Sequence, residues 1–399
     1  MTMRSPTVKP ARLGLLWFGV QAVWGALLGI SLQARSSQLG GAHAIASYGV
    51  IATAGAIVAA ITQVVVGPLA DRHRARGSRR TEFYVAGVAV SVVGIVWFYG
   101  AAQFAQLIGG FMLLQFGMNV ATGPYQSVIP DYVTPERTGS ASSWMAVLQS
   151  IGNAVGAIVA SLVADLRAVA ALLVALLVAT CAATISHVRT LPLRPVASKP
   201  LHVTRAFVDL FVSRALIYVG FYTLLGYLFF YVAQSLGPSA RASATATSGV
   251  TFLIFLVAAA IGAALCASPA DRFDRRTVVT ISGAIFVAGL LGFLLGHGVT
   301  WAIVAVSVAG LGWGAFLTAD WALGCAILPK DALATAFGVW NLALIAPQIL
   351  APAFTSGVLG SLHALDAPWA PRFAFGCAAI EVCAGILWVW RLPAQRAGV

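Results

Sequence analysis

Apolar runs of about 20 residues, separated by short polar segments, recur along the whole chain. A helix needs about 20 apolar residues to cross roughly 30 Å of hydrocarbon, and lipid offers no partner for a backbone N–H or C=O group. The pattern therefore predicts an all-α membrane protein with twelve spanning helices. Their approximate ranges are 13–36, 45–70, 82–101, 104–129, 139–163, 168–187, 207–234, 247–267, 278–296, 300–328, 336–359 and 372–390.

Composition supports lipid as the solvent, because 60% of the residues are apolar, 9% are charged and the mean hydropathy is +0.90. A net charge of +12 would indicate a nucleic-acid partner in a water-soluble protein. Here most of the 24 Lys and Arg residues stand in the N-terminal segment and in every second loop. The positive-inside rule then predicts that both termini are cytoplasmic. The first apolar run is too long for a cleavable signal peptide and is expected to be the first spanning helix.

A basic, proline-containing segment between the sixth and seventh spans divides the chain into two halves. We expect a first six-helix bundle at 1–187, a cytoplasmic linker at 188–206 and a second bundle at 207–399. Short strings repeat across this division: Asp71-Arg72 follows the second span and Asp271-Arg272 follows the eighth, an offset of 200 residues (271 − 71). Six helices repeated in the same orientation are expected of one class of transporter folds.

Four short segments carry a family resemblance. Residues 67–80 read GPLADRHRARGSRR, and residues 271–276 read DRFDRR. The first resembles the Asp-Arg…Gly-Arg-Arg loop of major facilitator superfamily transporters, in the longer spacing of sucrose-transporter-like members, with Ser78 at the position of the loop glycine. The strings PYQSVIPDYVTPER (124–137) and DWALGCAILP (320–329) are similar to the bacterial glycoside-pentoside-hexuronide branch. The resemblance implies the major facilitator fold, with two pseudo-symmetric six-helix bundles.

In the family, this loop latches the two halves on the cytoplasmic side and opens when the transporter switches. The resemblance therefore implies a gating role for a set of charged residues, although the same charges could merely set the topology. The predicted gating residues are Asp71, Arg72, Arg79, Arg80, Asp271 and Arg272.

Polar side chains inside the spans fall at helical spacings, so each set shares one face of its helix. The first helix carries Trp17, Gln21, Trp24, Ser31 and Arg35 in steps of three, four or seven. Lipid rejects such groups, so these faces should line a passage for solute or, alternatively, form hydrogen bonds between helices. The predicted substrate-binding residues are Gln21, Trp24, Gln115, Asn119, Gln126, Gln149, Asn153, Arg214, Tyr218, Tyr222, Trp313, Asp320, Asn341 and Gln348.

Three ionisable residues, Arg214, Asp320 and Glu381, lie well inside spans, where an unpaired charge is costly. Arg214 and Asp320 should stand at matched depths, roughly 12 Å from the cytoplasmic ends, which permits an ion pair. The pair could be structural, or it could open on substrate or proton binding. Asp320 and Glu381 are the predicted proton-coupling residues; for Glu381 the alternative is a protonated acid hydrogen-bonded to a neighbouring helix.

Rival functions have less support in the sequence. We find no nucleophile, base or metal motif, and the five cysteines lack the spacing of a metal site, so we expect no enzyme, cofactor or metal. A membrane receptor or scaffold remains the non-transporter alternative. The favoured function is a secondary transporter of a small polar organic solute, a sugar or glycoside moved with protons, and efflux of a drug or metabolite by antiport is second. We expect a monomer in the inner membrane of a bacterium, in contact with lipid and without a nucleic-acid partner.

Overall fold

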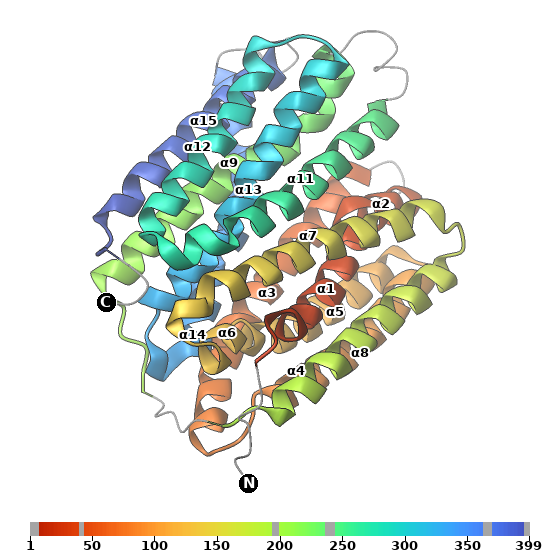
Figure 1. Cartoon of the computed structure of the whole chain (residues 1–399). Helices are drawn as coiled ribbons and strands as arrows, with labels where there is room; N and C mark the ends of the chain where they lie inside the picture. The colour runs from red at the N-terminus through yellow and green to blue at the C-terminus, as the bar shows by residue number, and fades with distance from the viewer. Residues whose placement is uncertain (1–7, 40–43, 194–198, 236–243, 362–368, 395–399) are drawn as a thin grey trace. The chain divides into compact units, whose positions relative to one another are not determined.

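The computed structural model describes residues 8–39, 44–193, 199–235, 244–361 and 369–394, and every regular element in these ranges is a helix (Figure 1). Five residues of the predicted linker, 194–198, lie outside these ranges.

Each predicted span coincides with helical structure. The spans of the first half correspond to α1 (Pro10–Ala26) continued by η1 (Leu27–Ser31) and α2 (Leu32–Leu39), then α3 (Ala44–Ala75), α4 (Thr81–Gly100), α5 (Phe104–Tyr125) with α6 (Val128–Tyr132), α7 (Thr138–Leu162) and α8 (Leu166–Thr190). Those of the second half correspond to α9 (Arg205–Ser235), α11 (Ala244–Arg272), α12 (Arg275–Leu295), α13 (Val299–Ile327), α14 (Leu333–Ser361) and α15 (Ala370–Trp388). The short 3-10 turns η3 (Pro135–Arg137), η4 (Lys330–Ala332) and η5 (Val389–Arg391) stand at helix ends.

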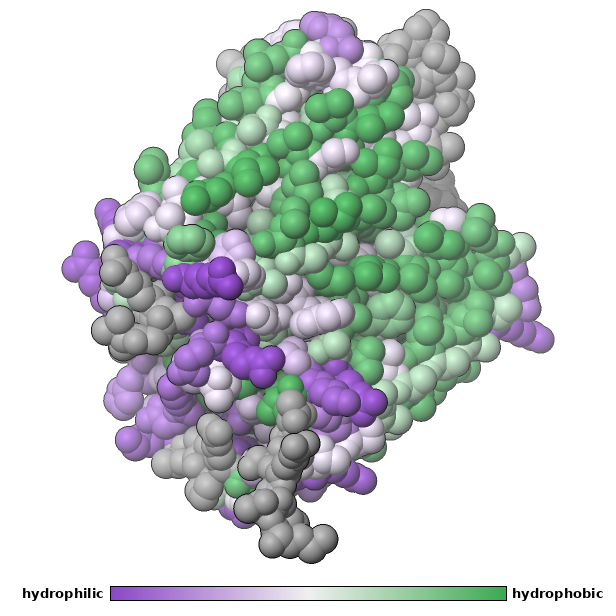
Figure 2. Space-filling view, in the orientation of Figure 1, coloured by the Kyte–Doolittle hydropathy of each residue, from purple (hydrophilic) through white to green (hydrophobic). Residues whose placement is uncertain are grey.

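Ten helices in the described ranges are long and apolar enough to cross a membrane. Apolar residues cover the outward faces of the helices in Figure 2, and hydrophilic residues gather at helix ends. Exposed Ile57, Ile61 and Leu265 are examples of side chains that suit contact with lipid rather than water. The chain is therefore a multi-pass membrane protein.

The helix pairs of the first half recur in the second. In the first half α4 packs on α5, α3 on α5, α1 on α8, and α4 on α8. The equivalent pairs six spans later are α12 on α13, α11 on α13, α9 on α15, and α12 on α15. The repeat seen in the sequence is thus a repeat of helix packing.

Grouping by contacts divides the chain into two units. The first unit comprises residues 1–134, 148–202 and 328–339, and the second comprises 135–147, 203–327 and 340–399. Helices α7 and α14 therefore each contribute their first turns to one unit and their remainder to the other.

The first spanning helix contains a π-helical segment, η1, at its centre. A π turn is wider than an α turn, so it rotates the residues that follow relative to those before it. Ser31 accepts a hydrogen bond from the Tyr99 hydroxyl on α4 at 2.9 Å, and Arg35 donates to the Ala101 carbonyl. Gln21 instead bonds Gln149 on α7. Ser31 and Arg35 thus contact α4 and the residue after it, whereas Gln21 contacts α7.

Candidate functional site

A buried ion pair forms the centre of the second unit. Arg214 on α9 donates through Nη1 to a carboxylate oxygen of Asp320 on α13. The two residues are 2% and 3% exposed. The ion pair predicted from their matched depths is confirmed. In a low-dielectric interior the attraction within such a pair is strong, and so is the cost of leaving one partner alone.

Aromatic rings surround the guanidinium of this pair. Its Cζ atom lies 3.6 Å from the centre of the Trp340 ring on α14 and 4.8 Å from that of Tyr218, one turn along α9. The Tyr218 hydroxyl also accepts a 3.4 Å hydrogen bond from Nη2. Cation–π contacts of this kind gain strength where water is excluded. Two aromatic rings therefore hold the Arg214 guanidinium in place beside Asp320.

The aromatic cluster extends along α9. Phe221 stacks on Trp313 of α13 with ring centres 3.8 Å apart and planes 2° from parallel, and Tyr218 meets the same indole edge-on at 5.0 Å. The Tyr222 hydroxyl, one turn further, accepts a 2.8 Å hydrogen bond from Gln348 of α14. The structure thus joins six predicted residues, Arg214, Tyr218, Tyr222, Trp313, Asp320 and Gln348, in one unit.

The first unit holds a chain of amide side chains on α3 and α5 and at the end of α5. Gln126 donates to Gln63 at 3.5 Å, Gln63 donates to Asn119 at 2.7 Å, and Asn119 donates to the side-chain oxygen of Gln115 at 3.3 Å. Gln115, Asn119 and Gln126 are the predicted stripe on the fourth span. Gln63 of α3 links them. Amides carry both donors and acceptors, so such a chain can exchange partners with hydroxyl groups of a neutral solute.

Five further predicted residues lie on α1, α7 and α14. Gln21 donates to Gln149 at 3.2 Å, which brings two of them together within the first unit. Trp24, Asn153 and Asn341 are half-buried. The structure gives these three no role beyond their position.

Glu381 on α15 accepts a hydrogen bond from the Thr223 hydroxyl of α9 at 3.2 Å. Its second carboxyl oxygen is buried without a partner among the described residues. This arrangement fits the alternative foreseen for Glu381, an acid bonded to a neighbouring helix. It leaves the coupling role untested.

The last turns of α3 place the predicted gating residue Asp71 at the start of α14. Its Oδ1 accepts from the backbone N–H of Ala334 at 3.0 Å, and its Oδ2 accepts from the N–H and hydroxyl of Thr335 at 2.9 and 2.7 Å. A carboxylate is stabilised at a helix N-terminus, where N–H groups lack partners within the helix. We call this set of contacts the first latch.

Arg80 supports the first latch from the side. It donates to Asp71 at 2.6 Å and also to Asp131 of α6, and all three residues are buried. Burial alone would lower the pKa of the Arg80 guanidinium, but the two carboxylates outweigh burial and raise it. Arg80 therefore keeps its positive charge. Neighbouring Arg79 donates to the carbonyls of Val188 and Leu191, each at 2.7 Å, and ties this loop to the end of α8.

The equivalent carboxylate in the second half meets the start of α7. Asp271 accepts from the N–H groups of Gly139 at 2.6 Å and Ser140 at 2.9 Å, and from the Ser140 hydroxyl. We call this the second latch. Nearby Arg275 donates to the Pro135 carbonyl at 3.1 Å. Arg72 and Arg272, also predicted to gate, are exposed and make no ion pair among the described residues.

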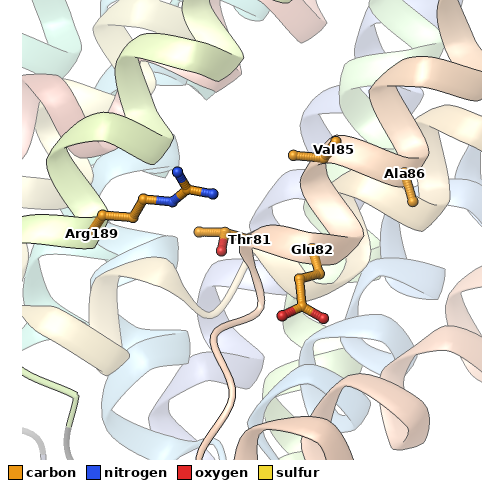
Figure 3. Close-up of a pocket in the computed structure, with 5 residues that line it drawn as sticks. All are labelled: Thr81, Glu82, Val85, Ala86 and Arg189. Carbon is orange, nitrogen blue, oxygen red and sulfur yellow. The ribbon is translucent and has the colours of Figure 1, made fainter.

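Two open grooves lie at helix ends of the first unit. One of about 340 Å³ is formed by Thr81, Glu82, Val85, Ala86 and Arg189; Arg189 points toward Thr81, and Glu82 points away (Figure 3). The other, of about 670 Å³, is lined by Pro68, Arg72, Ala75, Arg76, Lys199, Pro200, Leu201 and Thr335. Neither groove includes a predicted substrate-binding residue.

Several residues of these sites were not foreseen. Gln63 stands alone among apolar neighbours on its span, so no stripe indicated it. Trp340 gave no signal because a tryptophan in an apolar run is usually a packing residue. Asp131, Ser140 and Thr335 stand near helix ends, where only the folded chain shows which carboxylate or arginine they meet.

Comparisons with known proteins agree with this architecture. The family model of the Major Facilitator Superfamily matches residues 13–352. A search among curated proteins finds no match. Three solved structures are similar over nearly their whole length. The human organic anion transporter MFSD10 (TETRAN) has a TM-score of 0.74 and 12% identity, with 95% of this chain and 98% of that chain covered.

The transporter FucP in its outward conformation has a TM-score of 0.72 and 14% identity, covering 96% of this chain and 99% of that chain. The proton:xylose symporter XylE, bound to 6-bromo-6-deoxy-D-glucose, has a TM-score of 0.68 and 15% identity, covering 97% and 95%. At such identities the likeness shows the fold alone. Together with the family model over most of the chain, it establishes that the protein belongs to the Major Facilitator Superfamily and is a transporter of that fold.

Proposed function

We propose that this protein is a secondary active transporter that moves a small polar organic solute by alternating access and couples the movement to protons. A sugar or glycoside is the favoured solute. The observation that carries the proposal is the Arg214–Asp320 pair, in which the carboxylate is 3% exposed and its cationic partner is held by aromatic rings.

Protonation of Asp320 would remove its negative charge and weaken its attraction to Arg214. Proton binding would therefore leave the Arg214 side chain freer to move. Asp320 and Glu381, the two carboxyl groups that the sequence places well inside spans, both belong to the second half of the chain. Acids of the first unit stand at helix ends or in loops: Asp71, Glu82, Asp131, Asp165 and Asp331. We therefore assign coupling to the second unit and hydroxyl recognition to the amide chain of the first.

A neutral, hydroxyl-rich solute suits this division. Amides at Gln63, Asn119 and Gln126 can donate and accept, and rings such as Trp313 can pack on the apolar face of a sugar. The neighbour XylE, a proton:xylose symporter, agrees with this choice without deciding it. We further propose that the protein is a monomer in a bacterial inner membrane, with both termini in the cytoplasm.

The aromatic cluster of Phe221, Trp313 and Tyr218 favours a second candidate, an antiporter that exports an apolar drug or metabolite. Flat apolar molecules bind to such rings without needing amides.

Proteoliposomes holding an acid-quenched dye distinguish these functions. An inward gradient of the correct sugar should acidify the lumen, whereas an exported drug should drive protons the opposite way. Asp320→Asn should lower proton-driven accumulation by about tenfold or more, as expected for loss of about 1.4 kcal/mol or more of coupling, while solute exchange continues. Glu82→Gln, an equivalent change at a side chain that is 67% exposed, should leave both unchanged. Undiminished proton flux in Asp320→Asn would exclude Asp320 as the coupling group.

A further inference from the structure

A buried arginine on α3, close in sequence to Asp71 of the first latch, has no hydrogen-bond acceptor among the described residues. Arg74 lies on α3 three residues after Asp71, is 2% exposed, and has Nε, Nη1 and Nη2 all buried without a hydrogen-bond acceptor among the described residues. A buried unpaired charge is strongly unfavourable and calls for a physical reason.

The neighbouring arginines of this loop are accounted for. Arg80 is held by Asp71 and Asp131, and Arg79 is held by two carbonyls at the end of α8. Arg72 and Arg76 are exposed and line the larger groove, where water can solvate their charges. Arg74 is therefore the buried cation of this loop that has no acceptor within the described residues.

Asp71 is the carboxylate whose partners must change if the latch opens. It accepts four hydrogen bonds, and three of them come from the first turn of α14, through Ala334 N–H, Thr335 N–H and the Thr335 hydroxyl. If α14 moves away, Asp71 keeps only Arg80. Oδ2, which binds Thr335 alone, is then left without a donor in a buried place.

We propose that Arg74 is a further gating residue. When the start of α14 moves away from Asp71, the Arg74 guanidinium donates a hydrogen bond to Asp71 Oδ2. This inference rests on the proposed alternating access. Residues three apart on a helix lie on one face, and an Asp followed by an Arg at that spacing can pair. Arg74 is unpaired when the latch is closed and paired when it is open, whereas Asp71 is satisfied in both states.

The exchange brings the two states closer in free energy. The closed state has the helix-capping bonds of Asp71 but carries the cost of the unpaired Arg74. The open state loses those bonds but gains the Asp71–Arg74 pair and removes that cost. Replacing Arg74 by methionine, which keeps most of the stem without the charge, should favour the closed state.

A spin-label distance measurement tests this directly. Nitroxides at Arg76→Cys and Lys330→Cys, two exposed positions on either side of the latch, report its closure once the native cysteines Cys181, Cys266, Cys325, Cys377 and Cys383 are replaced. The protein with native Arg74 should show a short and a long distance whose shares change with solute. Arg74→Met should raise the ratio of the short-distance population to the long-distance population by about fivefold or more. It should also raise the thermal midpoint, while Arg74→Lys retains both distances. Arg189→Gln, which removes an exposed arginine elsewhere, should change neither.

A double-mutant cycle separates partner exchange from packing. In an Asp71→Asn background no carboxylate is left for Arg74 to take, so Arg74→Met should no longer shift the distances. The same shift in both backgrounds, or no shift in either, would overturn the inference. A single distance in the labelled protein with native Arg74, unaffected by solute, would instead contradict the proposed alternating access.

Discussion

At the scale of single residues, the cost of separating charges decides what Arg214 and Asp320 can do. The pair is buried, and Trp340 covers the guanidinium at 3.6 Å. Such a pair adds little net stability compared with apolar residues of the same size, yet losing one partner is severe. A pair with these properties is suited to act as a switch, because one proton that neutralises Asp320 removes most of the attraction between the two side chains.

Three variants of this pair should differ in stability. Arg214→Met and Asp320→Leu, each made alone, should lower the free energy of unfolding by about 3–5 kcal/mol, because the remaining charge is buried without a partner. The double variant should recover most of this loss. Thermal unfolding in detergent measures all four proteins, and equal losses in the single and double variants would show that the charges do not act as a pair.

Sequence could predict this pair but not its surroundings. Matched depth on the seventh and tenth spans was sufficient to predict the contact between Arg214 and Asp320. Trp340 and Gln63 were not predicted, because each stands alone in an apolar run and becomes part of a site only when another helix packs against it.

At the scale of elements, the latches depend on close helix approach. A Cβ atom on Gly67 of α3 would lie 2.7 Å from the Thr335 Cα atom, and one on Gly139 of α7 would lie 2.6 Å from the Ala270 carbonyl carbon. Both neighbours are backbone atoms, which cannot move aside without moving the helix. The glycines therefore permit each carboxylate to reach the N–H groups of its helix start.

Gly67→Ala and Gly139→Ala should each weaken one latch and shift the spin-label distances toward the open state. Gly226 of α9 is the matched control, because a Cβ atom there meets nothing within 4 Å. Gly226→Ala should leave the distances unchanged and stabilise the protein by about 0.5–1 kcal/mol, the usual gain from alanine within a helix. Similar distances in all three variants would show that close approach at the latches is unimportant.

The extents of the helices followed from hydropathy, whereas the π turn at Leu27–Ser31 did not. An apolar segment has the same hydropathy whether it forms an α turn or a π turn. Residues at the end of the turn and after it bond to α4 and the residue that follows α4, through the Tyr99 hydroxyl at Ser31 and the Ala101 carbonyl at Arg35.

At the scale of the whole molecule, the repeat between the two halves of the chain explains more of the structure than any other feature does. The Asp71 and Asp271 strings 200 residues apart predicted two equivalent loops, and each carboxylate does cap a helix start. The sequence could not show that Asp71 meets α14 and Asp271 meets α7, because those contacts join segments more than 130 residues apart. Whether the bundles 1–187 and 207–399 move as units stays a prediction.

The most direct test of alternating access is the labelling of one cysteine from each side of the membrane. Gln348→Cys, at an exposed position in a protein without other cysteines, should react with a water-soluble reagent from the side opposite the arginine-rich loops while both latches are intact. With Asp71→Asn and Asp271→Asn together, it should react from the arginine-rich side instead. Labelling from the same side in both proteins, or from neither, would contradict the transport mechanism proposed for this chain.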